Sequence, residues 1–268
     1  MSVVPDVSVV IPTFHREEQL VEAVRSALDQ PEVEVEVIIV DDSADGSAAK
    51  SASSLRDPRV RYVRRAAPSR GAPAFARNDG WKLARGRFVH FLDDDDILAE
   101  GASRALVSAL DGAPKRGVAV GTVHPFGRDL AALQREQAYF AAATSALRHT
   151  HSRAGLVARL LYDATPLVNS ACMIRRSCIE AIGGYATDVP RCEDVDFYLR
   201  AIRRFGFVFV DRPVVHYRTG APSLMHTATT AEMLKSSYRR IYRAYRREHG
   251  FLELLCLHVL AELIQLIS

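Results

Sequence analysis

Residues 7–42 read VSVVIPTFHREEQLVEAVRSALDQPEVEVEVIIVDD, and this stretch decides the fold. It opens with a β-branched apolar run, Val7 to Ile11, which predicts a buried strand that ends at Pro12. An amphipathic helix is predicted from about Arg16 to Gln30, and a second apolar strand from Val35 to Val40. A strand, a helix and a strand in succession are typical of a parallel sheet.

The alternation of strands and helices continues along the chain. Further strands are predicted at residues 59–63, 88–92, 118–123, 169–174, 207–210 and 214–217, the last two separated by Pro213. Helices are predicted near residues 46–56, 73–85, 101–110 and 193–205, and residues 124–165 carry weaker, mostly helical patterning. This order predicts an α/β fold with a mostly parallel, doubly wound sheet flanked by helices, in which two lobes share one continuous core.

Size and composition exclude several classes of protein. The chain has 268 residues, of which 48% are hydrophobic and 25% are charged, as in globular rather than disordered or fibrous proteins. Its net charge of +3 is too small to indicate nucleic-acid binding, so we expect no nucleic-acid partner. The four cysteines lack the spacing of a metal site, and residues 1–11 lack the pattern of a signal peptide. We therefore expect a reduced, cytoplasmic protein.

The C-terminal residues differ in character from the rest. Residues 231–250 contain six basic and two acidic side chains, an excess of four positive charges. As a helix, this segment has an apolar and a basic face: Tyr238, Ile241, Tyr242 and Tyr245 on one, and Arg239, Arg243 and Arg246 on the other. Residues 251–267 are strongly apolar but interrupted by Glu253, His258 and Glu262, and each charge buried in a membrane costs about 2.5 kcal/mol or more. We therefore expect residues 226–268 to form a helical extension that packs on the rest of the chain, joins two copies of it, or lies on a membrane surface.

Functional groups follow three of the predicted strands. The first strand leads into Pro12-Thr13-Phe14, the second into Asp41-Asp42, and the strand at residues 88–92 into Asp93 to Asp96. In an open parallel sheet the ligand crevice lies outside the carboxyl ends of the strands, so up to six carboxylates converge on one edge. Carboxylates that lie close together repel each other unless a cation joins them, and Mg²⁺ and Mn²⁺ prefer oxygen ligands. The alternative is that Asp93 to Asp96 form a solvated loop that caps the next helix.

The sequence lacks the usual glycine-rich phosphate loops. Neither GxxxxGK(S/T) nor GxGxxG follows the first strand, so a bound diphosphate would need a metal ion in place of such a loop. Phe14 can stack on a base, and Asp42 can accept a hydrogen bond from the edge of that base. A second acidic cluster, Glu193-Asp194-Val195-Asp196, begins the helix predicted at residues 193–205. These acids can stabilise the helix N-terminus, or one of them can act as a general base.

From about Val7 to Arg218, a series of motifs resembles the family 2 glycosyltransferases of the GT-A fold. The motifs, in order along the chain, are PTFH at 12–15, VDDS at 40–43, AFARNDG at 74–80 with ARG at 84–86, FLDDDD at 91–96, GGY at 183–185 and CEDVDFYLR at 192–200. They correspond to the family patterns PTYN, VVDDGS, SAARNxGxxxARG, FLDxDD, GG(F/Y) and GEDxDLxLR. This sequence departs from them at His15, at Ser43-Ala44 and at Cys192, and none of these changes removes a carboxylate.

The resemblance implies roles for specific residues. Asp194 matches the catalytic base, and Asp95 and Asp93 match the acidic pair that binds a divalent ion, Mn²⁺ or Mg²⁺. The positions that match donor-binding residues are Pro12, Phe14, Asp42, Arg77, Asp93 and Asp94. Residues 216–223 match the terminal YRxH-type motif of the family only in part.

The implied reaction is the transfer of a sugar, with inversion, from a nucleoside-diphosphate sugar to a hydroxyl of a glycan or lipid-linked acceptor. A UDP-sugar is the favoured donor, and such reactions build polysaccharides, glycolipids and other cell-surface glycans. Residues 1–123 are expected to bind the nucleotide sugar, residues 124–225 to bind the acceptor and supply the base, and residues 226–268 to form the helical extension. The resemblance thus implies an enzyme, and the cysteine pattern and the C-terminal helices lead us to expect it in the cytoplasm or at the cytoplasmic face of a membrane.

Other interpretations of the same residues stay open. A HAD-type phosphatase has DxDx(T/V) after a strand, but Ile97 stands at the last of these positions. A nucleotidyltransferase normally carries a glycine-rich loop with Lys or Arg after the first strand. A catalytically inactive sugar-nucleotide-binding or scaffold subunit would carry the same motifs, and consumption of the donor would distinguish it from an enzyme.

Overall fold

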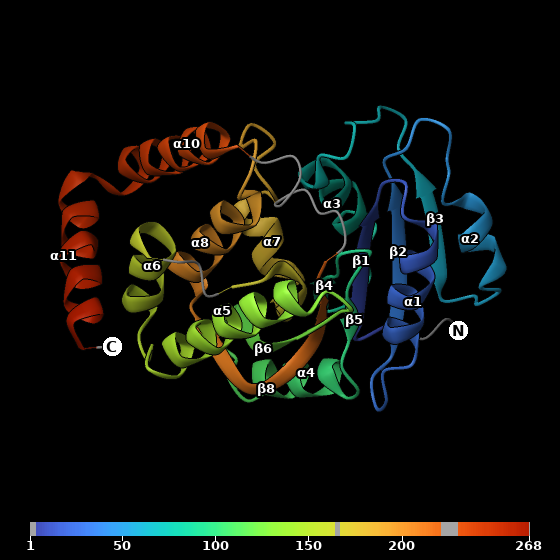
Figure 1. Ribbon diagram of the computed structural model, residues 1–268, viewed down its shortest axis with the longest axis horizontal. Coiled ribbons are helices and arrows are strands. Elements are labelled where there is room, and N and C mark those ends of the chain that lie inside the picture. The colour runs from blue at the N-terminus through green and yellow to red at the C-terminus, as the bar shows by residue number, and fades with distance from the viewer. Residues whose placement is uncertain (1–3, 164–166, 221–229, 268) are drawn as a thin grey trace.

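An eight-stranded mixed sheet organises the computed structural model, which describes residues 4–163, 167–220 and 230–267 (Figure 1). The strand order is β3-β2-β1-β4-β7-β6-β8-β5. In chain order the strands are β1 (Val7–Thr13), β2 (Val35–Asp41), β3 (Val60–Arg64), β4 (Phe88–Phe91), β5 (Ile97–Leu98), β6 (Val118–Phe126), β7 (Cys172–Arg175) and β8 (Phe207–Arg218). Four of the seven strand pairs are parallel, which confirms the prediction of a mostly parallel sheet.

The first four strands form the parallel half of the sheet. In the register, Val7 of β1 stands opposite Val35 of β2 on one side and Phe88 of β4 on the other. All residues of β2 and β4 are buried, because helices cover both faces of the sheet here. Strands buried on both faces read as continuous apolar runs, which explains why these were the clearest strands in the sequence.

Pro12 does not end the first strand, contrary to the prediction. Strand β1 continues to Thr13, and Pro12 stands opposite Val40 of β2. The carbonyl of Val10 accepts a hydrogen bond from the N–H of Leu92, which follows β4, and the carbonyl of Thr13 accepts one from the N–H of Asp42, which follows β2. Because backbone groups of alternate residues point to the same side of a strand, those of Pro12 face the β4 side, as those of Val10 do. The pairing with β4 already ends at Val10, so the missing N–H of proline leaves no strand bond unmade.

The parallel pattern stops at β4. Strand β7 lies between β4 and β6 and is antiparallel to both, so the strand predicted at residues 118–123 runs in the same direction as β4 but is not its neighbour. Strand β7 itself is shorter than the predicted strand at 169–174, because Asn169–Ala171 forms a 3₁₀ turn. Alternating patterns cannot show which strands become neighbours, so the sequence did not reveal this insertion.

Strand β8 is one long strand where two were predicted. It pairs with β6 in parallel, and its register shifts between Gly121 and Val123 of β6. Pro213 stands opposite Thr122 at this irregularity. A bulge accommodates a proline without ending the strand, which is why Pro213 does not separate two strands.

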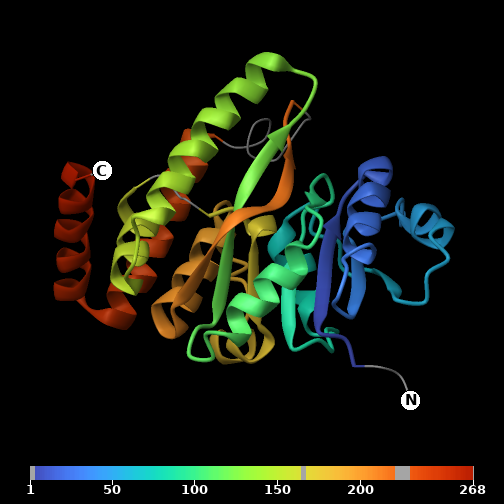
Figure 2. The same cartoon turned by 90° about the horizontal axis from the view of Figure 1, so that it is seen from below.

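Helices cover both faces of the sheet and confirm the predicted positions within a few residues (Figure 2). They are α1 (Glu17–Leu28), α2 (Ala49–Ser54), α3 (Pro73–Trp81), α4 (Ala102–Asp111), α5 (Leu130–Arg148), α6 (Arg153–Tyr162), α7 (Arg176–Ile182), α8 (Glu193–Phe205), α10 (Ala231–His249) and α11 (Phe251–Ile267). The buried side chains form two clusters, one with α1 and α4 and the other with α3, α6 and α8. The sheet thus divides the core into two layers, and each layer contains residues from both halves of the chain.

The two C-terminal helices stand at the end of the molecule opposite β3 and α2 (Figures 1 and 2). Ile241 and Tyr245 of α10 are buried, and Leu257 and Ala261 of α11 are buried where it packs on α6. The C-terminal helices thus pack on the rest of the chain, one of the arrangements expected from the sequence, and the predicted boundary at 225/226 lies outside the described residues. Within the described ranges, no helix combines the length and apolar character that crossing a membrane requires.

Candidate active site

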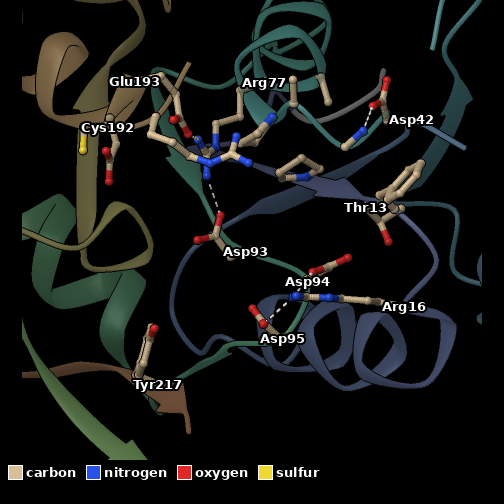
Figure 3. Close-up of a pocket in the computed structure, with 18 residues that line it drawn as sticks. Thr13, Arg16, Asp42, Arg77, Asp93, Asp94, Asp95, Cys192, Glu193 and Tyr217 are labelled. Atoms are coloured by element: carbon tan, nitrogen blue, oxygen red, sulfur yellow. Dashed lines mark hydrogen bonds and ion pairs between the residues drawn. The ribbon is translucent and has the colours of Figure 1, made fainter. Parts of the chain in front are cut away.

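A pocket of about 320 Å³ lies where the carboxyl ends of β1, β2 and β4 approach the N-terminus of α8 (Figure 3). All eight residues predicted for the site line this pocket: Pro12, Phe14, Asp42, Arg77, Asp93, Asp94, Asp95 and Asp194. They come from segments that are far apart in the sequence and that the sheet brings together. This position, outside the carboxyl ends of parallel strands, is the usual place for a ligand in an open α/β sheet.

Two of the six predicted carboxylates do not line the pocket. Asp41 is fully buried behind it and accepts hydrogen bonds from the N–H of Ser43 at 2.8 Å and from the hydroxyl of Tyr62 at 2.8 Å. Burial and this bond raise the pKa of Tyr62 to about 12. Asp96 is also buried and accepts from the N–H of Arg218 at 3.2 Å. Both aspartates accept hydrogen bonds from backbone N–H groups of neighbouring segments and so hold those segments in place.

Asp42 lies beneath the loop that follows β3. Its Oδ1 accepts from Nη1 of Arg65 at 2.6 Å and from the N–H of Ser69 at 2.8 Å. Its Oδ2 accepts from the Ser69 hydroxyl at 2.8 Å and from the N–H of Gly71 at 2.6 Å. Burial by itself raises the pKa of Asp42, but these hydrogen bonds hold it below its usual value. Each oxygen already accepts two bonds, so a ligand can bond to Asp42 only by replacing one of them.

Phe14 is the aromatic side chain beside Asp42. It is 37% exposed, and Gly71 packs directly against its ring. Gly71 has a φ of +83°, and a Cβ atom added to it would lie 3.0 Å from Cδ1 of Phe14. Glycine therefore lets the loop close against the aromatic ring in a backbone conformation that other residues rarely adopt.

Arg16 lies between Asp94 and Asp95 (Figure 3). Its Nη1 donates to Oδ1 of Asp94 at 3.2 Å and also to Oδ2 of Asp95. Burial, and then the charge of Asp95, raise the pKa of Asp94 to about 7, and burial also raises the pKa of Asp95. Arg16 is thus the cation that offsets the repulsion between these two carboxylates.

Arg77 joins the two acidic clusters that the sequence singled out. Its guanidinium is nearly buried and donates from Nη2 to Oδ1 of Asp93 and from Nη1 to Oε1 of Glu193, both at 2.7 Å. It also lies over the ring of Tyr185, 5.3 Å from its centre. Its Nε–H has no hydrogen-bond partner among the described residues, so one donor is unused. Arg77 therefore fixes the end of β4 relative to the start of α8.

Asp194 lies in the first turn of α8. Cys192, which precedes the helix, has a left-handed backbone with a φ of 58°, a conformation that suits the glycine of the family pattern better than cysteine. Oδ1 of Asp194 accepts from the N–H of Val195 at 2.8 Å. Burial, and then the charge of Glu193, raise the pKa of Asp194 to about 7, while Arg77 acts to lower it. A carboxyl group with this pKa can accept a proton near neutral pH, as a general base must.

The chemistry of the pocket suits a hard divalent ion held in part by a substrate. No cluster of three or more His, Cys, Asp or Glu side chains that could hold a metal occurs within the part of the chain that the structure describes. Mg²⁺, however, is commonly bound by one or two carboxylates together with substrate phosphates. Asp93 and Asp95 fit that pattern, although each now pairs with an arginine, Arg77 and Arg16 respectively, that would have to release it.

Three further pocket residues, Arg16, Arg191 and Tyr217, were not predicted for the site. The position of Arg16 could have been predicted from the sequence. It follows the first strand closely, after Phe14, and the carboxyl end of that strand lies beside the carboxylates that follow the neighbouring strands. Arg191 and Tyr217 come from the second half of the chain, where the sequence did not show which strands are neighbours. Tyr217 lies in the stretch that matches the terminal YRxH-type motif in part, and Arg191 directly precedes the CEDVDFYLR motif, but neither motif predicted these two residues for the site.

Comparisons with known proteins identify a matching family and several relatives. A family model described as "Glycosyl transferase family 2" matches residues 8–183, more than half of the chain. Uncharacterized protein MT1568 of Mycobacterium tuberculosis (strain CDC 1551 / Oshkosh) is 29% identical over 239 residues, which cover 88% of this chain and 72% of that protein.

Two relatives with more specific names match a shorter stretch. The succinoglycan biosynthesis protein ExoO of Rhizobium meliloti (strain 1021) is 36% identical over 110 residues, 41% of this chain and 31% of that protein. A GalNAc(5)-diNAcBac-PP-undecaprenol beta-1,3-glucosyltransferase of Campylobacter jejuni is 35% identical over 105 residues, 38% of this chain and 34% of that protein. The alignments thus span about a third of the length of these two relatives.

Solved structures share the fold. S. aureus TarS 1-349 in complex with UDP-GlcNAc superposes with a TM-score of 0.65 at 17% identity, over 91% of this chain and 66% of that one. This likeness shows that the mixed sheet with its flanking helices has the GT-A fold. Together with the family model and the ordered motifs around one pocket, it leads to one conclusion: the chain belongs to glycosyl transferase family 2.

Proposed function

We propose that this glycosyltransferase moves a sugar from a nucleoside-diphosphate sugar to an acceptor hydroxyl with inversion at the anomeric carbon. The observation that carries the proposal is the presence of Asp42, Asp95 and Asp194 around a single pocket. Each side chain has one role in such a transfer: Asp42 binds the base, Asp95 holds the diphosphate through a cation, and Asp194 removes a proton.

The donor we propose is a UDP-sugar. The TarS structures that share the fold were solved with UDP and with UDP-GlcNAc. In this chain, the ring of Phe14 would stack on the base, and Asp42 would accept from the edge of the base in place of Ser69 or Gly71. Binding of the base therefore moves the loop at residues 69–71.

Gly71 gives a test of this loop. Gly71→Ala is expected to raise the donor KM about tenfold with a smaller effect on kcat, because the strained backbone costs about 1–2 kcal/mol and the new methyl group presses on Phe14. Gly183→Ala is the matched control, since Gly183 has a φ of +81° but nothing within 4 Å of an added Cβ. Equal donor KM values for the two variants would contradict a role of the loop in base binding.

Asp93 and Asp95 would hold Mn²⁺ or Mg²⁺ together with the diphosphate. When bound, such an ion neutralises the charge that develops on the departing diphosphate. In the protein alone, Arg16 supplies the positive charge beside Asp94 and Asp95 instead. Arg16 must therefore turn away from Asp95 when the ion binds.

The competition between Arg16 and the ion can be measured without a reaction. Arg16→Met is expected to lower the melting temperature of the metal-free protein, because two buried carboxylates then repel each other without a counter-ion. The same variant should gain more in melting temperature from added Mn²⁺ than the unchanged protein. Arg25→Met, an exposed position on α1, serves as the control. A smaller Mn²⁺ effect in Arg16→Met would show that Arg16 assists the ion rather than competing with it.

Asp194 would remove the proton from the attacking hydroxyl. Asp194 is half-buried and lines the pocket, and its raised pKa of about 7 makes it a stronger base than an ordinary aspartate. The hydroxyl attacks the anomeric carbon from the side of Asp194, and the diphosphate leaves from the opposite side. Arg77 fixes the position of Asp93 relative to the first turn of α8 through its hydrogen bonds to Asp93 and Glu193.

The reaction itself is tested by incubating the full chain with UDP-sugars, Mn²⁺ and glycan or lipid-linked acceptors. Release of UDP that depends on the acceptor is the expected result. The names of the relatives, a succinoglycan biosynthesis protein and an undecaprenol-linked glucosyltransferase, favour acceptors from polysaccharide or glycolipid synthesis. Donor binding without turnover on any acceptor would favour an inactive sugar-nucleotide-binding subunit.

A further inference from the structure

Helix α11 presents a stripe of large apolar side chains to solvent. Leu252 is 76% exposed, Val259 51% and Leu266 82%, although such side chains are usually buried. Together with Leu255 and Leu263 they recur at intervals of three or four residues, so they lie on one face of the helix. We call these five residues the α11 stripe.

The α11 stripe is not the face that holds the helix in the fold. Leu257 and Ala261, which are nearly buried, lie on the side that packs against α6. On a helical projection they stand roughly opposite the α11 stripe, which therefore faces away from the rest of the chain. Figure 1 shows α11 at the outer edge of the molecule, with α6 on its inner side. A continuous apolar face of this kind usually marks a surface that binds something.

Positive charge adjoins the N-terminal end of the α11 stripe. Arg243, Arg246 and Arg247, in the last two turns of α10, are exposed. Arg246 lies over the ring of Phe251, which is the first residue of α11 and is 55% exposed, at 5.2 Å from the ring centre. The surface thus combines aliphatic side chains, an aromatic ring and arginines within a short distance.

We propose that the α11 stripe lies in the surface of an anionic membrane, with the arginines at the end of α10 bound to lipid phosphates. Helices that lie in this way bury an apolar face among the acyl chains and keep basic side chains at the headgroups. Arginine also suits phosphate through its several N–H donors. A second copy of the chain is a poorer fit, because the exposed acids among the described residues at the end of α10 and on α11 are Glu248 and Glu262, fewer than the three arginines.

The test is flotation of the full chain with vesicles of phosphatidylcholine, with or without about one third phosphatidylglycerol. The unchanged protein should float with the anionic vesicles and much less with the neutral ones. Replacing both Leu255 and Val259 by Gln should weaken binding to anionic vesicles about 100-fold, because two buried aliphatic side chains are lost. Replacing both Arg246 and Arg247 by Ala should weaken it about tenfold or more at low salt.

Leu130→Gln is the matched control, since Leu130 on α5 is also 72% exposed but lies outside the α11 stripe. It should float like the unchanged protein. The changed side chains are exposed, so all variants should keep the melting temperature, which is measured in parallel. Failure of the unchanged protein to float, or flotation of the Leu255 and Val259 variant at full strength, overturns the proposal. If sedimentation velocity shows that the unchanged protein is a dimer and that the Leu255 and Val259 variant is a monomer, the α11 stripe binds a second copy instead. The assay contains no nucleotide sugar, so its outcome is independent of the proposed transferase reaction.

Discussion

Replacing Asp194 by asparagine is expected to lower kcat by about 10²- to 10⁴-fold, the usual contribution of a general base. The amide keeps the size of the side chain and can still accept from the N–H of Val195, but it cannot take a proton. Donor binding should therefore change little, as measured by calorimetry with a UDP-sugar and Mn²⁺.

The pH dependence gives this prediction a second readout. With donor saturating, kcat/KM for the acceptor should rise about tenfold per pH unit below about pH 7 and level off above it, because the ionised form of Asp194 is the active one. The Asp194→Asn variant should lose this rise along with its rate. Asp196→Asn is the control on the same helix turn, since Asp196 pairs with Arg200 at 2.8 Å and does not line the pocket. A loss of donor affinity as large as the loss of rate would speak against Asp194 as the base.

Replacing Asp95 by asparagine is expected to be the second most damaging change. It removes one of the two carboxylates proposed to hold the divalent ion, and the amide oxygen is a weaker ligand that carries no charge. We expect kcat/KM for the donor to fall about 100-fold or more at a fixed Mn²⁺ concentration, with partial recovery as Mn²⁺ is raised. A titration of activity and of melting temperature against Mn²⁺ measures both effects.

The melting temperature separates this effect from a loss of folding. Without metal, Asp95→Asn should be at least as stable as the unchanged protein, because it removes one of the adjacent carboxylates whose pKa is raised by burial. Asp45→Asn, at an exposed position after β2, is the control and should titrate like the unchanged protein. An unchanged Mn²⁺ requirement in Asp95→Asn would mean that the ion, if one is used, binds elsewhere.

Much of the first half of the fold follows from local patterns. Buried parallel strands read as unbroken apolar runs, as in residues 35–41, and the carboxyl ends of such strands must meet. That argument alone brought Phe14, Asp42 and Asp95 to one edge, and all three line the pocket. The place of Asp194 came from the family resemblance, because spacing along the chain cannot tell which helix N-terminus reaches the crevice.

The remaining features depend on long-range pairing. The position of β7 between β4 and β6 is set by contacts between segments about 80 and 50 residues apart, which no local period records. The bonds that occupy both oxygens of Asp42, and the pairing of Arg16 with Asp94 and Asp95, likewise require side chains from distant loops. These contacts fix the side chains of the site in the protein without a ligand. The sequence shows that the charged residues are present, but not which of them pair.

The insertion of β7 has a practical consequence for anyone who wishes to divide this protein. Strand β4 belongs to the first half of the chain, yet its outer edge is closed by β7 from the second half, and β6 depends on β7 and β8 for both of its neighbours. A fragment cut at residue 123 would therefore expose an open backbone edge on β4, separate Arg77 from Glu193, and tend to aggregate. Nucleotide-binding studies should use the intact polypeptide, because the two halves are interleaved and neither is a self-contained folding unit.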